Sequence, residues 1–304
     1  MRYFLISIDT LRYDIAREVG LTRLFDVSQA NHYSSSNWTL PGHAAILTGD
    51  AIHHNCHWNW GFPEDDEASK FVCEARENAL RGNTIAEVMR LKGLNTIAYV
   101  GGGFVSKWFG FDRGFDEWDE HDFLTSEELP EFPDDSFIFL HTWHVHDYFQ
   151  DAGWDISQYR TNEFVDAKRY LSEETLNRGK AVYRDRAAQI VIYLKRLLWN
   201  YRDDVVILTS DHGEAFLEDG KQIHHGVYTD LQDDWVSKVP LCCKNLDVTL
   251  PSITFDVDIK ALLLGNSLGE RCLRSHYSYI ESQYIYERRL DSWEQKEGAC
   301  EDLR

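Results

Sequence analysis

Two short segments place metal-ligating side chains directly after apolar runs. Asp9 follows the run over residues 3–8, and Asp211 and His212 follow the run over residues 204–210. Such runs are typical of strands buried on both faces of a parallel sheet, and such sheets bind ligands beyond the carboxyl ends of their strands. Together these oxygen and imidazole donors suit zinc, manganese, calcium or magnesium. A single Asp at a strand end would be better explained as a helix cap.

A hydroxyl group, that of Thr39, stands just before a predicted helix over residues 42–47. At the start of a helix, backbone amides and the positive end of the helix dipole stabilise an oxyanion. Thr39, deprotonated with the help of a metal, is therefore a candidate nucleophile. Taken alone, Thr39 would be better explained as an ordinary helix cap.

Histidines gather in two further segments. His141, His144 and His146 follow an apolar run over residues 136–140, and His224 and His225 stand next to each other. Five histidines in two such short stretches exceed ordinary structural need. Each is a candidate metal ligand, anion clamp or general acid, whereas a lone histidine would be interpreted as structural. We expect at least two of them to be functional.

The elements that must position these side chains alternate between strands and helices. The predicted strands cover residues 3–8, 95–100, 136–140 and 204–210. Thr84 and Glu87 form a capping-box pattern that opens a helix through about Leu91, with Gly93 as its stop. A long helix over residues 172–199 is indicated by apolar residues at helical spacing, namely Ala188, Val191, Ile192, Leu194, Leu197 and Leu198. The alternation predicts an α/β fold with a mainly parallel sheet covered on both faces.

No internal repeat or clear boundary divides the chain, so we expect one domain over residues 1–304. Its C-terminal segment, residues 265–304, is less regular, with a possible strand pair at 277–286. The six cysteines include no C-x-x-C pair, which argues against a cysteine-built zinc site. Cys242 and Cys243 lie in an apolar run and are predicted to be buried free thiols.

The formal net charge of -20 restricts the partners of the chain. Nucleic acids and anionic membrane surfaces both require clustered Lys and Arg, so neither is expected. A small anionic ester needs a local positive centre, which a divalent metal supplies. The run before Asp9 is too short for a signal peptide, and no apolar stretch approaches the roughly 20 residues of a membrane span. We therefore expect a cytoplasmic, metal-dependent enzyme.

Four blocks, in this order, resemble the sulfatase-like branch of the alkaline phosphatase superfamily. They are residues 5–12 (first strand), 38–49 (nucleophile), 110–117 (substrate-side loop) and 209–214 (late metal motif, trailed by His225, Tyr228 and 239–241). The resemblance covers roughly residues 3–265. It implies a three-layer alkaline-phosphatase-like fold, with helices on both faces of a mainly parallel sheet and a reduced C-terminal subdomain.

The resemblance also implies roles for individual residues. It makes Asp9, Thr39, Asp211 and His212 the ligands of one divalent metal, with zinc the expected ion; adding His225 and the central histidines would hold two. Thr39 falls on the nucleophile position, and His146 or His225 is expected to assist the leaving group. The spacing to Tyr228 favours His225 over His224 as the ligand. The residues expected to contact the substrate are His43, His144, His146 and His224.

The nucleophile block departs from the sulfatases that use formylglycine. These carry Cys or Ser, followed by Pro and Arg in a fixed pattern, whereas this chain has Thr39 and replaces the Arg by His43. Thr cannot become formylglycine, and Thr nucleophiles are familiar in phosphodiesterases, phosphotransferases and phosphonate ester hydrolases of the superfamily. We therefore expect a hydrolase of phosphoric or phosphonate esters. The alternatives are a sulfuric ester hydrolase with unmodified Thr39 and a non-catalytic metal-containing binding protein.

Overall fold

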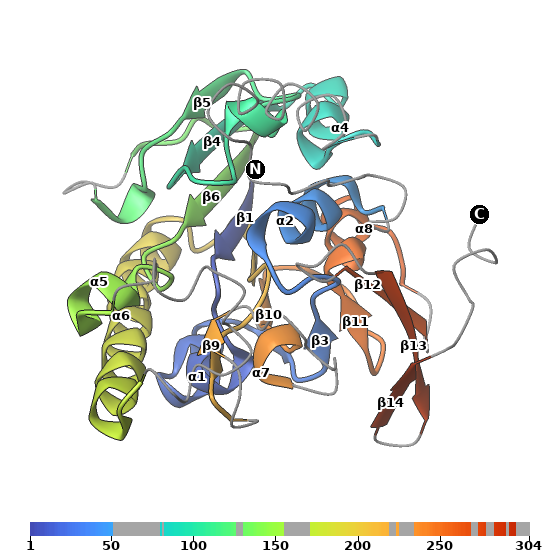
Figure 1. The fold of residues 1–304 in the computed structure, drawn as a ribbon. Coiled ribbons are helices and arrows are strands. Elements are labelled where there is room, and N and C mark those ends of the chain that lie inside the picture. Colours follow the sequence, from blue (N-terminus) through green and yellow to red (C-terminus); the bar gives the residue numbers. More distant parts are fainter. Residues whose placement is uncertain are drawn as a thin grey trace, which may run out of the picture.

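A computed structural model describes residues 1–50, 80, 82–125, 130–154, 171–218, 223–224, 234–268, 273–277, 283–289 and 292–295. Within them a seven-stranded sheet has the order β2-β10-β7-β1-β6-β4-β5 (Figure 1). Its strands are β1 (Arg2–Ile8), β2 (Val27–Gln29), β4 (Asn95–Val100), β5 (Glu117–Asp119), β6 (Ser136–Thr142), β7 (Val205–Thr209) and β10 (Leu241–Lys244). Strands β7, β1, β6, β4 and β5 are parallel, and β10 runs antiparallel to β7 and β2. The prediction of a mainly parallel sheet is confirmed.

Helices cover both faces of this sheet (Figure 1). One face carries α1 (Tyr13–Glu18), α5 (Tyr148–Ala152) and α6 (Glu173–Asn200), and the other carries α2 (Thr39–Thr48), α4 (Ile85–Leu91) and α8 (Ile259–Leu263). Side chains alternate along each strand, so that Phe4, Ile6 and Ile8 of β1 join the core beneath α6. Leu5, between them, joins the core beneath α2. Both faces of β1 are therefore buried, as its continuous apolar run predicts.

Two of the three predicted helices begin where their caps indicate, whereas the one predicted over residues 42–47 begins earlier, at Thr39. Thr84 and Glu87 form the capping box of α4, and the Ser172 hydroxyl accepts a hydrogen bond from the Thr175 amide at the start of α6. Two residues of the predicted apolar stripe depart from it: Ile192 is 71% exposed, and Ala188 is only partly buried. The buried stripe of α6 follows Tyr183, Ala187, Ile190, Val191, Leu194, Leu197 and Leu198. Ile192 is rotated by about 100° from Val191, which turns it toward solvent.

Short elements complete the described residues. Strand β3 (His32–Tyr33) pairs in parallel with β11 (Thr254–Phe255), and β8 (Ala215–Phe216) pairs antiparallel with β9 (Ile223–His224). The short helices are α7 (Asp234–Ser237) and the 3-10 helices η1 (Leu21–Leu24), η3 (Lys107–Phe109), η4 (Phe123–Thr125) and η7 (Asp256–Asp258). Strands β12 (Leu273–Tyr277), β13 (Gln283–Arg289) and β14 (Ser292–Gln295) form a separate antiparallel sheet. The predicted strand pair is confirmed, since Tyr277 pairs with Gln283.

Cys242 and Cys243 are buried free thiols, as predicted. The other four cysteines, Cys56, Cys73, Cys272 and Cys300, lie outside the described residues. Among the helices of the described ranges, none combines the length and apolar character needed to cross a membrane.

Candidate metal centre and nucleophile

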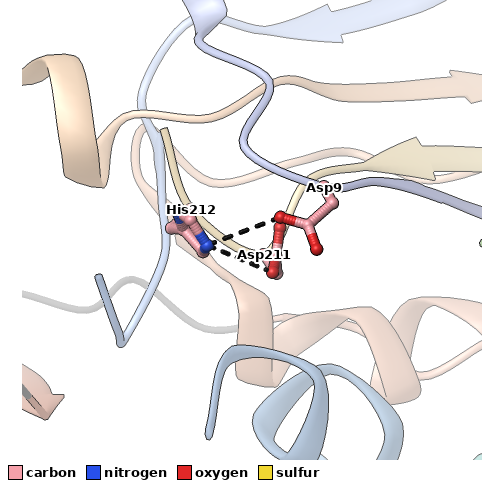
Figure 2. A group of neighbouring side chains, drawn as sticks. All are labelled: Asp9, Asp211 and His212. Carbon is pink, nitrogen blue, oxygen red and sulfur yellow. Dashed lines mark ion pairs between the residues drawn. The ribbon is translucent and has the colours of Figure 1, made fainter. Parts of the chain in front are cut away.

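The central sheet brings three metal-ligating side chains together at one edge. Asp9 directly follows β1, and Asp211 and His212 follow β7, the parallel neighbour of β1. Ligand atoms of all three side chains lie within 4.8 Å of one another (Figure 2). His212 Nε2 is 3.6 Å from Asp9 Oδ1 and 3.5 Å from Asp211 Oδ2. The predicted convergence of two carboxylates and an imidazole is therefore present.

These three side chains fit a divalent cation. All are buried, and among the described residues no donor has hydrogen-bond geometry to Asp9 Oδ1 or Asp211 Oδ2, although His43 Nδ1 and His212 Nε2 lie 3.4 Å and 3.5 Å from Asp211 Oδ2. A buried carboxylate oxygen without a donor is unfavourable unless a cation faces it. Burial by itself would raise the pKa of Asp211, but His212, His43 and His141 outweigh burial and hold that pKa well below its usual range. Asp211 is thus ionised, as a metal ligand must be.

Thr39 is the first residue of α2 and faces this cluster. Its Oγ1 donates a hydrogen bond to Asp9 Oδ2 at 3.2 Å. The helix cap is Trp38, whose backbone is extended, so Thr39 does not occupy the cap position. The helical hydrogen bonds of α2 begin at the Gly42 amide, which donates to the Trp38 carbonyl at 3.3 Å. The hydroxyl therefore stands where the dipole of α2 is positive.

Two glycines allow the loops of the site to approach closely. A Cβ on Gly42 would lie 2.8 Å from the Asp211 carbonyl oxygen and 3.0 Å from its Cβ. A Cβ on Gly213 would overlap the carbonyl group of Trp235. The Gly213 amide donates a hydrogen bond to the carbonyl of the next residue, Val236, at 2.6 Å. Helix α2 can thus lie directly against the Asp211 loop because residue 42 has no side chain.

The loop after β1 is fastened to the loop after β7. The Thr10 amide donates to Asp211 Oδ1 at 3.2 Å, and the Tyr183 hydroxyl donates to the Thr10 carbonyl at 2.6 Å. Arg12 Nη1 donates to the Glu214 carbonyl at 3.1 Å and also pairs with Glu218. These bonds join the two loops directly beside the candidate metal ligands.

His43 lies in the layer beneath Thr39. Its ring is fully buried, with Nε2 2.9 Å from Ser7 Oγ and Nδ1 2.9 Å from the Thr39 carbonyl oxygen. Nδ1 is also 3.4 Å from Asp211 Oδ2. Burial opposes a charge on this ring, but Asp211 and Asp9 outweigh burial and raise its pKa. All of these contacts are with protein groups, and the contact with substrate expected of His43 stays a prediction.

The three central histidines take different positions. His141 is buried with Nε2 3.8 Å from Asp9 Oδ2, and its ring makes an edge-to-face contact with that of His43 at 4.8 Å. His146 lies against the rings of Trp143 and Phe149. His144 directs Nε2 to Gln189 Oε1 of α6 at 2.8 Å. Burial lowers the pKa of both His141 and His146, so both rings favour the neutral form.

The structure describes only part of the second histidine segment, which holds His224 and His225. His225 lies outside the described residues, and His224 is described only as a backbone position in β9. The roles expected for both therefore stay predictions, as do the substrate contact of His144 and the catalytic part of His146.

Sequence analysis did not single out two polar groups beside the site. Ser7 holds His43, and its signal was present as a lone hydroxyl near the end of an apolar run. Asp256 contacts Ser35 in the turn before α2 from 221 positions away. Nothing in the local sequence of Asp256 indicates that contact.

No family model matches the sequence, and no curated protein matches it. Solved structures match the fold. A 2-O GAG sulfatase is 14% identical with a TM-score of 0.66, over 97% of this chain and 84% of that chain. A phosphonate monoester hydrolase from Silicibacter pomeroyi is 15% identical with a TM-score of 0.61, over 96% and 87%. The C-terminal periplasmic domain of EcEptC from Escherichia coli, in complex with Zn, is 11% identical with a TM-score of 0.59, over 90% and 88%.

The chain has the alkaline-phosphatase-like fold. The resemblance inferred from the four sequence blocks is thereby confirmed at the level of the fold. The similar structures are enzymes that act on phosphoryl or sulfuryl groups, and one of them holds zinc. In this alkaline-phosphatase-like chain the candidate metal centre lies at the carboxyl ends of β1 and β7, with Thr39 beside it.

Proposed function

We propose that this chain is a metal-dependent hydrolase of phosphoric or phosphonate esters with Thr39 as its nucleophile. One observation carries the proposal: Thr39 Oγ1 lies 3.2 Å from Asp9 Oδ2, beside the buried group of Asp9, Asp211 and His212. A hydroxyl on a helix start and a cluster of metal-ligating atoms are each common. Their direct contact inside a buried site is what a covalent ester hydrolase requires.

Asp9, Asp211 and His212 would hold the metal, with the Thr39 hydroxyl completing the set. Zinc is the proposed ion, and manganese, calcium or magnesium would suit the same donors. When bound, the metal would lower the pKa of the hydroxyl and balance the negative charge of the ester. A second ion would require further ligands such as His225, so one ion per chain is the simpler proposal.

The residues of the chain divide the remaining work. The hydrogen bond to Asp9 orients the Thr39 hydroxyl, and His43 holds the Thr39 carbonyl from below. Thr39 reacts as the alkoxide, after its hydroxyl proton has passed to solvent. Its Oγ1 attacks phosphorus, and the bond between phosphorus and the leaving alcohol breaks as the bond to Oγ1 forms. The first amides of α2 stabilise the negative charge that gathers on the phosphoryl oxygens.

The second half of the reaction releases Thr39. Water attacks phosphorus, and the Thr39 oxygen leaves with the bonding electrons. Burial lowers the pKa of His146, so its ring is neutral near pH 7 and suited to accept a proton from that water. We assign the proton that the leaving alcohol needs to His225, which is the other histidine expected to act as an acid or base.

The test measures metal content and hydrolysis of bis(4-nitrophenyl) phosphate, with and without chelator. Thr39→Ala should reduce turnover by about 10³-fold or more, and Thr39→Ser, which keeps a hydroxyl, should retain part of it. Stoichiometric metal together with chelator-sensitive turnover that depends on Thr39 supports the proposal. Bound metal without turnover of any ester would favour the alternative that the chain is a non-catalytic, metal-containing binding protein.

A parallel assay with 4-nitrophenyl sulfate separates the two ester classes. The same nucleophile and metal ligands serve sulfuryl transfer, so geometry alone does not choose between the groups. A ratio of kcat/KM that favours the sulfate would replace the proposed phosphoric ester substrate by a sulfuric ester and leave the roles of Thr39 and Asp9 unchanged.

A further inference from the structure

The turn that leads into the nucleophile helix is held by a carboxylate from a distant part of the chain. Residues 34–38 connect β3 to α2, and Asp256 opens η7 directly after β11. Strands β3 and β11 are parallel partners, with His32 opposite Thr254 and Tyr33 opposite Phe255. Because parallel strands leave a sheet at the same edge, Ser34 and Asp256 enter the same space side by side.

Both oxygens of Asp256 are used there. Oδ2 accepts a hydrogen bond from the Ser35 amide at 2.8 Å, and Oδ1 accepts one from the Val257 amide at 2.8 Å. The Ser35 hydroxyl donates to Oδ1 as well. One backbone amide thus faces each oxygen, an arrangement that an ionised carboxylate satisfies and a neutral amide side chain cannot.

The same turn is joined to the metal centre. The Ser34 hydroxyl donates to the carbonyl oxygen of Asp211 and lies 3.5 Å from Asp256 Oδ2. The Ser36 amide donates to Ser34 Oγ at 3.0 Å, and the Trp38 amide donates to Ser36 Oγ at 3.2 Å. Asp256 thus binds Ser35, Ser34 binds Asp211, and Ser36 binds both Ser34 and Trp38, so that hydrogen bonds hold the turn at each step up to the residue that precedes Thr39.

Burial of the Asp256 carboxylate is energetically unfavourable, and a residue that served only packing would not need a charge. Asp256 is fully buried, and burial raises the pKa of its carboxyl to about 6, even though Ser35 and Val257 oppose the rise. A neutral residue at this position would avoid the unfavourable burial of a charge. What the carboxylate provides instead is a fixed geometry for the turn.

We propose that Asp256 is a positioning residue for the nucleophile, which fixes Thr39 relative to Asp211 through the Ser34–Ser36 turn. The inference rests on the proposed function, since it concerns the placement of the Thr39 oxygen for attack. Among the described residues, the hydrogen bonds of Asp256 go to Ser34, Ser35 and Val257 and not to the side chains of the metal ligands or to the reacting atoms. Its effect should therefore appear in the rate of the chemical step rather than in metal or substrate binding.

The experiment compares Asp256→Asn with the unaltered protein, both fully loaded with zinc, on bis(4-nitrophenyl) phosphate. Asn keeps the volume but puts an amide nitrogen against one of the two backbone donors. We expect kcat to fall roughly 10-fold to 100-fold, because displacements of about 1 Å have effects of this size. KM and zinc stoichiometry should stay unchanged, which separates positioning from binding.

Two further variants keep the test decisive. Ser35→Ala removes the hydroxyl donor but keeps the amide, so a smaller fall in kcat is expected even if Asp256→Asn does not fold. Asp204→Asn is the matched control: this buried aspartate also accepts a backbone amide, that of Arg2 at 2.8 Å, but lies at the opposite edge of the sheet. Its kcat should equal that of the unaltered protein.

Two results would overturn the inference, and a third would overturn the proposed function on which it rests. If folded, zinc-loaded Asp256→Asn keeps the unaltered kcat, Asp256 does not position the nucleophile. If zinc content falls in proportion to kcat, Asp256 supports the metal centre instead. If the unaltered protein hydrolyses no ester, the proposed function fails, and amide hydrogen exchange over residues 34–38 then decides separately whether Asp256 holds the turn, with faster exchange expected in Asp256→Asn.

Discussion

Aspartates lie at both edges of the central sheet, the one where the parallel strands begin and the one where they end. Their hydrogen bonds and ion pairs differ between the two edges. At the amino ends of the strands, Asp204 accepts the Arg2 amide at 2.8 Å and pairs with its guanidinium at 3.2 Å, and Asp135 pairs with the Met1 amine at 2.9 Å. At the carboxyl ends, Asp9 and Asp211 converge on histidines and keep one oxygen each without a hydrogen bond from the described residues.

The difference shows which carboxylates serve the fold and which serve the site. A carboxylate that faces a cation or an amide at a partly exposed edge is satisfied, and its net effect on stability is small. Two buried carboxylates turned toward each other repel, and the folded chain must oppose that repulsion. A bound cation would remove it, so substitutions at the two edges should have opposite consequences for activity and stability.

The largest expected effect is on turnover. Asp211→Asn removes a metal-ligating charge and should lower kcat for an aryl phosphodiester by about 10²-fold to 10³-fold or more. Asp204→Asn, at the other edge, should leave kcat unchanged. Steady-state kinetics in excess zinc measures both. Equal losses in the two variants would show that the edges do not differ in function.

A second effect concerns the pH dependence of stability. Burial raises the pKa of Asp256 to about 6, with Asp258 adding to the rise, so its contribution to stability is fully present below the unfolded-state pKa and is lost as pH rises through 6. The loss is on the order of 3 kcal/mol. The free energy of unfolding of Asp256→Asn, measured with urea, should therefore fall less than that of the unaltered chain between about pH 4 and 6.5.

Asp135, at the amino edge, provides the control of opposite sign. Its hydrogen bond to the Met1 amine lowers its pKa, so its contribution is present at neutral pH and is lost as pH falls. Asp135→Asn should flatten the acid side of the profile only slightly, because the group is exposed. A pH profile for Asp256→Asn that matches the unaltered chain would contradict the assignment of a buried, charged Asp256.

A third effect is the response to metal. Zinc at about 100 times its Kd should raise the free energy of unfolding by about 2.7 kcal/mol, since it binds only the folded chain. Chelator should abolish the gain. Asp204→Asn should keep this increment and Asp211→Asn should lose most of it, as thermal unfolding with and without zinc would show. An increment that survives in Asp211→Asn would place the metal elsewhere.

The smallest expected effect comes from a single methyl group. Gly42→Ala would press a Cβ against the Asp211 carbonyl and should weaken zinc binding, with a loss of stability of about 1–3 kcal/mol. Gly179→Ala in α6 is the matched helix variant, because its Cβ would collide with the Trp154 ring and not with the backbone of a candidate metal ligand. It should lower stability by a similar amount and leave zinc affinity unchanged in a competition titration.

Sequence was most informative where local rules govern structure. The ends of β1 and β7, the capping box of Thr84 and Glu87, and the convergence of Asp9 with Asp211 follow from hydrophobic runs, helix caps and the geometry of parallel strands. These features depend on neighbours in the chain or on one strand pairing, which patterns of residue type reveal.

Contacts between distant segments were beyond the reach of the sequence. The hydrogen bond between Ser35 and Asp256 spans 221 positions and depends on the pairing of two-residue strands too short to show periodicity. The complete burial of His43 depends on how α2 lies over β1, which its own sequence does not specify. Ile192 was misplaced because an apolar residue beside a buried stripe cannot be assigned a side from type alone.

Strand β1 is the first strand of the chain, yet it lies in the middle of the sheet with β6 and β7 as its partners. During synthesis on the ribosome this apolar segment emerges with both edges open, and its second partner is made only after Val205. Such long-range pairing slows folding and exposes strand edges to wrong partners. The nascent chain therefore exposes an edge of β1 until β7 has been made, and a fragment that ends before β7 should aggregate rather than fold.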